Sequence, residues 1–569
     1  MITKKIVFSL LAVLVAVSAC TSAVVTTNTA STTLFVNAQV ITVDDARPTA
    51  ESLAVRDGKI LAVGSRSEVE SAAGSNVELR DMQGKTMLPG FIDAHGHVTY
   101  TNRLQLSANL APPPVGPVAS IPQLIETMKA HQSAYPDAPW IVGFGYDDSL
   151  MAERRHPTKQ ELDQVSTEFP VAVTHVSGHL MSCNSKCLEL AGVNANTKDP
   201  DGGLFRRMVN TDEPNGVAEE TAMRAFSEVI PSPDLSQQKS LLAKTQAEYA
   251  AFGVTTVQDG ASYGETLDLL EQAAAEELLY LDVVSFPYMV YGVEGLKQHP
   301  PTAEYANNYR VGGIKMTLDG SPQGKTAWLS KPYFHPPHGQ DKDYAGYATL
   351  QEEQVQALVD YAISNNVPML AHANGDAAAD QMIRTVRAAN KQFGKADRRP
   401  VMIHAQTVRE DQIDAMVEEG IVPSYFVAHT FFWGDWHRDS VLGEQRASRI
   451  SPLRSSSDKG LRYTIHNDTP VVPADMMRLL WTAVNRVTRS GKVLGTEQRA
   501  TVMEGIKAMT LYAAYQFFEE SSKGSLSVGK RADIVVLEEN PLTVPSMAIK
   551  DIAVLETIKD GKTVFRLGQ

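Results

Sequence analysis

Five residues of the types that bind metal ions each follow a short apolar run typical of a buried strand: His95, His97, His372, His404 and Asp468. Side chains at the carboxyl ends of parallel strands meet at one end of a barrel. Imidazole nitrogens and carboxylate oxygens are ligands of Zn²⁺ and related ions. The sequence therefore predicts one metal site, and with it hydrolysis by a metal-activated water.

The spacing of these residues suggests how the site is divided. His95 and His97 are separated by one residue, so on extended chain they point the same way and can bind one ion together. His372 and His404 follow later strands and suit a second ion. Asp468 can bind metal and also accept a proton from the attacking water. Any one histidine alone is more often a hydrogen-bonded core or surface residue, but their repetition at successive strand ends favours a metal site. A single ion held by His95, His97 and Asp468 would also suffice.

The middle of the chain alternates between strand and helix. Eight runs with the composition of buried strands begin near Met87, Val254, Leu281, Val311, Val367, Pro400, Ile421 and Tyr463. Helices with apolar residues on one face are predicted at 237–252, 352–364 and 409–419. Eight strand–helix units predict an α/β fold, a (β/α)₈ TIM barrel over residues 87–524.

Residues 98–233 are too many for an ordinary connection after the first barrel strand. They predict an insertion with its own strands, near 140–145 and 170–175. Because the insertion leaves from the end of that strand, we expect it to overhang the site and shape the substrate pocket.

The two ends of the chain share a β-rich texture, at 33–86 and 525–569, and Asp57-Gly58 is a strong hairpin signal. Chain termini commonly lie close together, so both ends predict one small β-sandwich domain. Two independent hairpins are the alternative, but they would be marginally stable alone.

The first residues have the features of a targeting segment. Lys4-Lys5 precedes an apolar stretch, and Ala19-Cys20 resembles a bacterial lipoprotein processing site. We expect residues 1–19 to be a signal peptide, Cys20 to carry lipid, and residues 20–32 to form a flexible tether. The predicted location is the bacterial cell envelope, anchored by lipid at the outer membrane and facing the periplasm. A secretory peptide cut near Ala19 is the alternative.

The composition narrows the choice of partners. The chain has 569 residues and a formal net charge of −14, with no basic run. We therefore expect a small-molecule substrate and no nucleic-acid partner; a homo-oligomer is left open. Cys183 and Cys187 could lie on adjacent turns of a helix, and we expect two buried free thiols, although an oxidising compartment permits a disulfide. A zinc clamp is disfavoured because no second cysteine pair accompanies them.

Residues 34–569 resemble the YtcJ-like branch of the metal-dependent amidohydrolase superfamily, which includes N-substituted formamide deformylases. The segments that carry the resemblance most specifically are Leu-Pro-Gly-Phe-Ile-Asp-Ala-His-Gly-His at 88–97 and Gly-Ser-Leu-Ser-Val-Gly-Lys-Arg-Ala-Asp-Ile-Val-Val-Leu at 524–537. Less specific strings lie at 215–220, 314–321 and 331–333.

The resemblance implies further roles. It implies that Lys315 is carboxylated and bridges two divalent ions, most simply Zn²⁺; a lysine that binds substrate or neutralises a carboxylate is the alternative. It implies that His179 polarises or orients the substrate, against a purely structural role. Relatives usually carry the last ligand in a Gly-Ser-Asp setting, whereas this chain has His466-Asn467-Asp468. His466 could therefore tune Asp468, join the metal shell or contact the substrate.

The segment 429–437 is rich in aromatic residues, and Phe431, Trp433 and Trp436 are expected to line a substrate pocket, with loop packing as the alternative. Together these features predict a hydrolase that cleaves an N-acyl or N-formyl C–N bond. The alternatives are hydrolysis of an ester, lactone or cyclic amide, an isomerisation, and a non-catalytic ligand-binding envelope lipoprotein.

Overall fold

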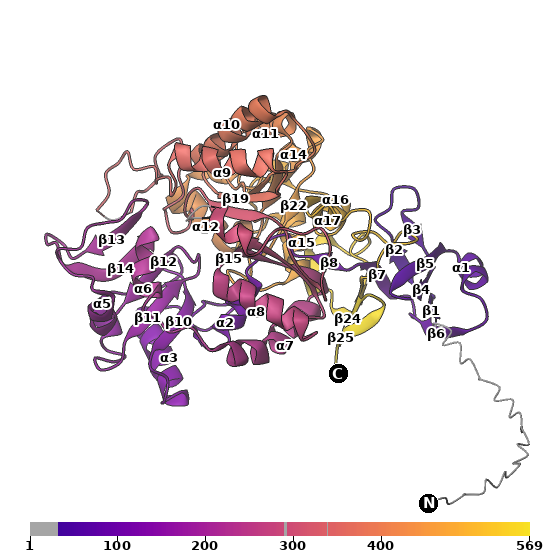
Figure 1. The fold of residues 1–569 in the computed structure, drawn as a ribbon, viewed down its shortest axis with the longest axis horizontal. Helices are drawn as coiled ribbons and strands as arrows, with labels where there is room; N and C mark the ends of the chain where they lie inside the picture. The colour runs from indigo at the N-terminus through magenta and orange to yellow at the C-terminus, as the bar shows by residue number, and fades with distance from the viewer. Residues whose placement is uncertain (1–31, 290–292, 338) are drawn as a thin grey trace, which may run out of the picture.

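The computed structural model describes residues 32–289, 293–337 and 339–569. The predicted signal peptide, Cys20 and nearly all of the predicted tether lie outside these residues. Figure 1 shows a central α/β body, with a strand-rich insertion on one side and a small body of strands from both chain ends on the other.

The central body is built on two parallel sheets. One has the order β17-β16-β15-β8, comprising β17 (Tyr309–Val311), β16 (Asp282–Pro287), β15 (Val254–Ser262) and β8 (Phe91–Ile92). The other has the order β18-β19-β20-β21-β22, comprising β18 (Ile314–Thr317), β19 (Met369–Ala373), β20 (Val401–His404), β21 (Val422–Tyr425) and β22 (Thr464–Ile465). Neighbouring strands pair in parallel within each sheet.

Backbone contacts connect the two sheets on both sides. Tyr288, after β16, pairs with Lys315 of β18. On the other side the Asp468 N–H donates to His95 O at 3.1 Å, which joins the chain after β22 to the chain after β8. This arrangement of strands is that of a TIM-barrel-like α/β fold.

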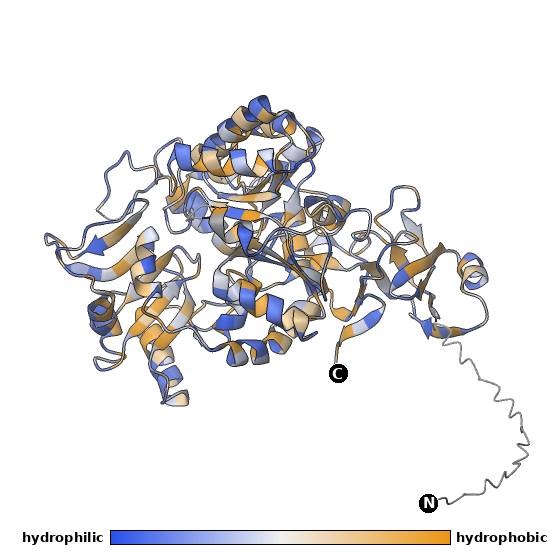
Figure 2. Cartoon of the chain, in the orientation of Figure 1, coloured by the Kyte–Doolittle hydropathy of each residue, from blue (hydrophilic) through white to orange (hydrophobic). Residues whose placement is uncertain are grey.

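Helices follow most of these strands. They are α8 (Gly264–Ala275), α9 (Glu352–Ser364), α10 (Asp376–Phe393), α11 (Glu410–Glu419), α12 (His429–Trp436) and α15 (Met476–Asn485), while α7 (Leu235–Ala251) precedes β15. The Asp234 side chain caps α7 by accepting from the Gln237 N–H at 2.8 Å. Figure 2 shows hydrophobic residues along the central strands and mixed hydropathy on the outer helices. The apolar periodicity of the sequence predicts outer helices of this kind, with one apolar face and one polar face.

Two strand assignments from the sequence need correction. The run at 311–316 is not one strand: it divides at Gly312-Gly313 into β17 and β18, which lie in different sheets. A Cβ at Gly313 would lie 2.0 Å from Pro368 O, so the chain passes there too closely for any side chain.

The run at 87–90 is not the first barrel strand. It forms β7 (Thr86–Pro89), which pairs with β2 (Gln39–Ile41) and β23 (Ile534–Leu537) in the small β body. The chain crosses into the central sheets at Gly90, where a Cβ would lie 2.5 Å from the Thr255 side chain. The barrel strand is β8, because only after this crossing does the chain pair with β15.

The small β body contains two sheets. One has the order β5-β4-β1-β6 and comprises β5 (Lys59–Gly64), β4 (Ser52–Arg56), β1 (Thr32–Val36) and β6 (Val77–Asp81). The other has the order β25-β24-β23-β7-β2-β3 and adds β25 (Lys562–Arg566), β24 (Val554–Lys559) and β3 (Thr49–Ala50). Both sheets share one hydrophobic cluster that includes Phe35, Leu53, Met87 and Ile534. Residues from both ends of the chain therefore make one core.

The insertion is organised around a single sheet of order β13-β14-β12-β11-β10-β9. Its strands are β13 (Gly203–Arg207), β14 (Pro214–Glu220), β12 (Leu180–Cys183), β11 (Val171–His175), β10 (Ile141–Tyr146) and β9 (Ala108–Asn109), and α3 (Ile121–Ala134) packs on it. The preceding helix α2 (Val98–Leu104) instead contacts the central body, where Asn102 Nδ2 donates to Gln238 O at 2.8 Å.

The two cysteines of the insertion are joined, so the prediction of two free thiols is wrong. Cys183 ends β12 and Cys187 lies in α5 (Ser185–Ala191), and the two form a disulfide. The turn between them is closed by Asn184, whose side chain accepts from the Cys187 N–H at 2.9 Å and brings the two Cα atoms to 5.5 Å.

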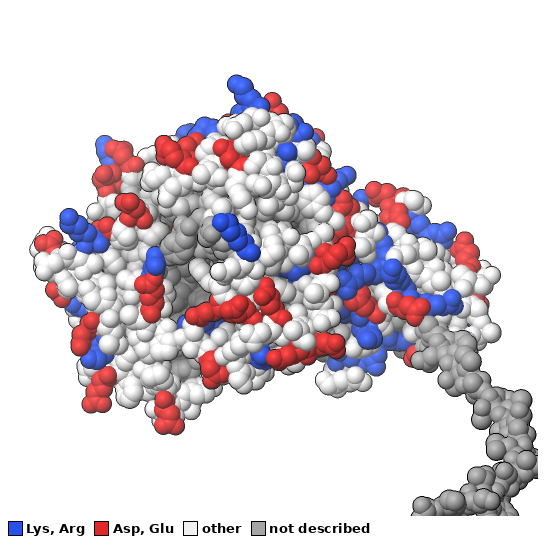
Figure 3. Space-filling view, viewed as in Figure 1, with Lys and Arg blue, Asp and Glu red and all other residues white. Residues whose placement is uncertain are grey.

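On the face drawn in Figure 3, acidic and basic side chains are interspersed over the barrel and the insertion, while Lys and Arg gather beside the small β body. Within the described ranges, no helix combines the length and the apolar character that crossing a membrane requires.

Candidate metal site

The predicted ligands converge at the carboxyl ends of the central strands. His95 and His97 follow β8, Lys315 lies in β18, His372 in β19, His404 ends β20, and Asp468 follows β22. All are buried except His97, which is half-buried. Residues more than 300 positions apart in the chain therefore share one site.

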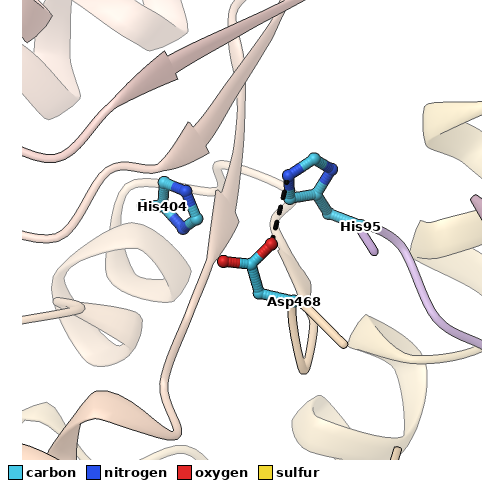
Figure 4. A group of neighbouring side chains, drawn as sticks. All are labelled: His95, His404 and Asp468. Atoms are coloured by element: carbon cyan, nitrogen blue, oxygen red, sulfur yellow. Dashed lines mark ion pairs between the residues drawn. The ribbon is translucent and has the colours of Figure 1, made fainter. Parts of the chain in front are cut away.

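Three of these residues form the centre of the group (Figure 4). His95, His404 and Asp468 each offer a ligand atom, and these atoms lie within 4.8 Å of one another. Asp468 Oδ1 is 3.4 Å from His95 Nε2 and 3.2 Å from His97 Nε2. One carboxylate oxygen thus faces two imidazoles, as an oxygen ligand beside histidine ligands would.

Lys315 and His372 complete the group. Lys315 Nζ lies 3.2 Å from His95 Nε2. The ring centroids of His372 and His404 are 4.5 Å apart. All six predicted ligands therefore surround one small volume.

Two of these residues have an unusual backbone conformation. His404 has φ 71° and Asp468 has φ 55°, in the left-handed region that non-glycine residues rarely adopt. Such conformations cost free energy and cluster at functional sites. They aim both side chains at the common centre.

The donors present fit a divalent ion. Asp468 Oδ1 and His372 Nδ1 are buried and lack a hydrogen-bond partner among the residues that the structure describes. Burial lowers the pKa of His95 and His404 well below the ordinary value, so both imidazoles are neutral, as metal ligands must be. A bound cation would satisfy the lone pairs of these two buried atoms.

A second set of contacts orients these rings. Gln258 Oε1 contacts His95 Nδ1, and Gly260 O lies 2.5 Å from His97 Nδ1. Each contact places a hydrogen on Nδ1 and leaves Nε2 free for a metal. The sequence reasoning missed Gln258, which lies in the buried strand β15 among other polar residues with no local signal that marks it.

Asp319 is another residue that the sequence reasoning missed. Its carboxylate accepts backbone N–H groups of Asn374 at 2.9 Å, Gly375 at 2.7 Å and Trp328 at 2.9 Å. Burial raises its pKa to about 7, although these hydrogen bonds act the other way. Asp319 Oδ1 also lies 3.3 Å from His372 Nδ1, without the geometry of a hydrogen bond.

Burial also affects the two central charged groups. It lowers the pKa of Lys315 to about 7, with Asp468 acting in the opposite direction. For Asp468, burial opposes ionisation, but the neighbouring His97 and His466 lower the pKa below the ordinary value. The carboxylate is therefore ionised near neutral pH.

His179 reaches the site from the insertion. Its ring lies 4.9 Å from that of His372, between centroids, and its Nδ1 is 2.7 Å from Glu220 Oε2. Glu220, at the end of β14, raises the pKa of His179 although burial acts in the opposite direction. Glu220 is the third residue that the sequence reasoning did not assign to the site.

The four residues expected to contact substrate have different surroundings. His466 lies inside the group, with Nε2 3.3 Å from His404 Nδ1 and Nδ1 2.8 Å from Ser424 Oγ. The segment expected to be a loop forms α12 instead. Trp433 Nε1 donates to Asp147 Oδ2 at 2.7 Å, Trp436 Nε1 donates to Gln323 O at 3.1 Å, and Phe431 packs on Trp481. Of the three aromatic residues, Trp433 lines a cavity beside the site.

The comparisons with known proteins agree with the fold. Residues 78–565 match the model of the amidohydrolase family, and the chain belongs to that family. The family consists of hydrolases, and its relatives point to amide-type bonds.

Two relatives match over nearly the whole chain. The N-substituted formamide deformylase of Arthrobacter pascens is 27% identical over 538 residues, covering 93% of this chain and 97% of the relative. The Bacillus subtilis protein YtcJ, described as an amidohydrolase, is 24% identical over 531 residues, covering 90% and 96%. The resemblance inferred from the sequence is confirmed.

A solved structure supports the fold. An uncharacterized metal-dependent hydrolase from Pyrococcus horikoshii superposes with a TM-score of 0.71 at 23% identity, covering 91% of this chain and 99% of its own. At that identity the likeness establishes the fold.

Proposed function

We propose that this protein is a metal-dependent hydrolase that cleaves N-acyl or N-formyl C–N bonds at the site around Asp468. The observation that carries the proposal is the convergence of His95, His404 and Asp468 with unpartnered buried donor atoms at the centre. The name of the Arthrobacter relative, a formamide deformylase, supports the substrate class.

The residues divide into those that would hold metal and those that would act on substrate. His95, His97 and Asp468 suit one divalent ion and His372 and His404 a second, with Zn²⁺ the ion that this donor set favours. When bound, such ions supply a water of lowered pKa and polarise the substrate carbonyl. We also propose that the two parallel sheets close into a (β/α)₈ barrel around this centre.

Lys315 is the proposed bridge between the two ions. Burial that lowers its pKa to about 7 favours the neutral amine, which is the form that reacts with CO₂. The amine nitrogen adds to the carbon of CO₂ and releases a proton, giving a carbamate. The neutral amine thereby becomes an anion, which would suit a position beside two cations better than a protonated lysine would.

Asp468 is the proposed proton carrier. Its ionised carboxylate faces the centre of the histidine group and can take a proton from the attacking water. The same proton then passes to the leaving nitrogen. We propose that His179, held by Glu220, donates a hydrogen bond to the substrate carbonyl oxygen.

The test is a substrate screen with the purified protein from residue 21 onward, supplied with Zn²⁺. N-formyl and N-acyl amides of benzylamine and alkylamines are compared with matched esters and lactones, with Asp468→Asn as the inactive control. Release of amine from wild-type protein alone supports the proposal. If the protein hydrolyses esters or lactones but not amides, the alternative of an ester or lactone hydrolase is favoured. If it turns over none of these compounds and binds no metal, the alternative of a ligand-binding lipoprotein is favoured.

We further propose that the protein is a lipoprotein of the bacterial cell envelope. Lys4-Lys5, the apolar stretch after them and Ala19-Cys20 support this. Incorporation of labelled palmitate into wild-type protein but not into Cys20→Ser tests it; equal absence in both would favour the plain secretory peptide.

A further inference from the structure

A cavity of about 290 Å³ lies between the insertion and the central body, beside the candidate metal site. Its walls are largely apolar. The residues that matter here are Thr101, Phe144, Phe432, Trp433, Thr469 and Arg489. Cavities of this kind, with apolar walls and few polar groups, are typical of small-molecule sites.

Two walls of the cavity are continuous with metal-site residues. Thr101 lies one helical turn after His97, and its N–H donates to His97 O at 2.8 Å. Thr469 directly follows Asp468, and its carbonyl accepts the His97 N–H at 2.8 Å. None of the six predicted ligands lines the cavity itself, so it would hold the part of a substrate that does not react, next to the chain segments that carry His97 and Asp468.

Arg489 gives the cavity one unpaired charge. Its Nε is buried without a hydrogen-bond partner, and its side chain forms no ion pair with any residue of the described ranges. Its guanidinium carbon lies 5.2 Å from the centroid of the Phe432 ring. Burial lowers the pKa of Arg489, with Asp147 acting in the opposite direction, but a guanidinium stays protonated in proteins.

The two acidic residues of the lining are already engaged. Asp147 accepts from Ser149 N–H at 3.0 Å and from Trp433 Nε1 at 2.7 Å. Glu248 is exposed, and both of its oxygens accept from Gln105 Nε2 at 3.0 Å. Of the three charged residues in the lining, Arg489 is therefore the one with a buried atom that is unpartnered within the described ranges, and the neutral Thr469 Oγ1 is unpartnered beside it.

We infer that this cavity binds substrates whose non-reacting arm is apolar and ends in a carboxylate, with Arg489 as the group that holds the carboxylate. The inference rests on the proposed function and names its substrate class: N-acyl compounds of acidic character, such as N-acyl ω-amino acids, in which an alkyl chain separates the amide from the carboxylate. Arg489 is half-buried, and its buried Nε has no hydrogen-bond partner in the part of the chain that the structure describes, which costs free energy; a carboxylate would satisfy the guanidinium with two parallel hydrogen bonds. The aromatic walls would cover the apolar arm.

The first test is calorimetry on the metal-loaded protein with 4-phenylbutyrate and its uncharged analogue 4-phenylbutanol. Wild-type protein should bind the acid about tenfold or more tightly than the alcohol, as a charge-assisted contact predicts. Arg489→Met should lose that preference and keep its metal content. Arg384→Met, which changes an exposed arginine paired with Glu352, is the matched control and should behave as wild type.

The second test is activity. Arg489→Met should lower kcat/KM for N-formyl-6-aminohexanoate about tenfold or more and leave kcat/KM for N-formyl-hexylamine unchanged. Arg489→Lys keeps the charge without the forked geometry, so its kcat/KM for the acidic substrate should fall between the values of the wild type and Arg489→Met. It replaces Arg489→Met in the test if that variant does not fold.

These measurements separate the two proposals. If no amide is hydrolysed but the acid still binds in an Arg489-dependent way, the proposed function fails and the assignment of the cavity stands. Equal affinity for the acid and the alcohol, or an acid preference that persists in Arg489→Met, overturns the assignment; in the second case the carboxylate would be held by the metal site.

Discussion

Glu220 Oε2 lies 2.7 Å from His179 Nδ1, and this pair brings the insertion to within ring contact of His372. Glu220 itself has φ 49°, and a Cβ at Gly320 would lie 2.1 Å from its Oε1. The loop after β18 is thus fitted around the Glu220 carboxylate. The insertion is therefore part of the site.

Removing this contact should lower turnover. Glu220→Gln keeps an acceptor for the Nδ1 hydrogen but loses the charge, and Glu220→Ala loses both. We expect kcat to fall about tenfold in the first variant and about a hundredfold in the second, with little change in KM, because a positioned proton donor contributes on that scale. Steady-state kinetics on an N-formyl amide measures this.

The control is the same pair of substitutions in a His179→Gln background. If Glu220 acts through His179, they should have no further effect there. Equal losses in both backgrounds would show that Glu220 supports the fold alone. Glu213→Gln, on an exposed insertion residue paired with Lys159, should leave kinetics unchanged.

Lys315→Ala should lower the metal content from about two ions per chain to about one, if a carbamate at this position bridges two ions. Elemental analysis of the purified protein measures it. Lys325→Ala is the matched control. Lys325 is also buried, but its Nζ donates to His335 O and Ser440 Oγ, both at 2.8 Å. One ion in both the wild type and Lys315→Ala would remove Lys315 from the metal shell.

Gln258→Leu should weaken metal binding about 10- to 100-fold, because partners that orient metal-binding histidines contribute on that scale. The Gln258 side chain contacts His95 Nδ1 and donates from Nε2 to Ala94 O at 2.8 Å. Competition with a chelator measures the affinity. Gln258→Glu retains the acceptor for His95 but loses the donor to Ala94 O, so its affinity should fall between those of the wild type and Gln258→Leu. An unchanged affinity in Gln258→Leu would mean that packing alone orients His95.

Asp282→Asn should destabilise the junction between the central and the small β bodies. Asp282 Oδ2 lies 2.5 Å from Lys523 Nζ, 2.9 Å from Arg531 Nη1 and 3.2 Å from Lys559 Nζ. Breaking a buried ion pair from one side costs about 3–5 kcal/mol. Urea unfolding at neutral pH measures it, with the exposed Asp137→Asn as the control; a loss no larger than in that control would contradict the prediction.

The same residue predicts a pH dependence. Burial opposes ionisation of Asp282, but Lys523, Lys559 and Arg531 lower its pKa below the ordinary value. A group whose pKa is lower in the folded state stabilises fully above its unfolded pKa, about 3.9, and loses that contribution as the pH falls through the folded pKa. The difference between wild type and Asp282→Asn should therefore be constant above about pH 5 and shrink in acid. A difference that grows in acid would contradict it.

Much of the site could be read from local patterns. His95, His372, His404 and Asp468 each follow a buried run, and parallel strands bring such positions to one edge whatever the details of packing. The supporting residues could not be read in this way. Gln258, Asp319 and Glu220 lie far in sequence from the histidines that they contact, and nothing local distinguishes them from other polar residues near strands.

The same distinction between local and long-range features applies to the fold. Periodicity placed the strands and helices because burial of one face is a local property of the sequence. It could not decide to which sheet a buried run belongs. Met87 and Phe91 are both fully buried, yet the chain changes sheets between them at Gly90, because of a close approach to Thr255 that only the packed structure creates.

The family, the strand–helix alternation and the types of candidate ligand can be predicted from the sequence, because these depend on residue chemistry and short-range spacing. The backbone conformations at His404 and Asp468, the contact of His179 with Glu220, the Cys183–Cys187 disulfide and the cavity beside Arg489 are seen only in the folded chain. Each of these depends on distances between segments remote in the chain, and such distances are set by how buried surfaces pack against one another.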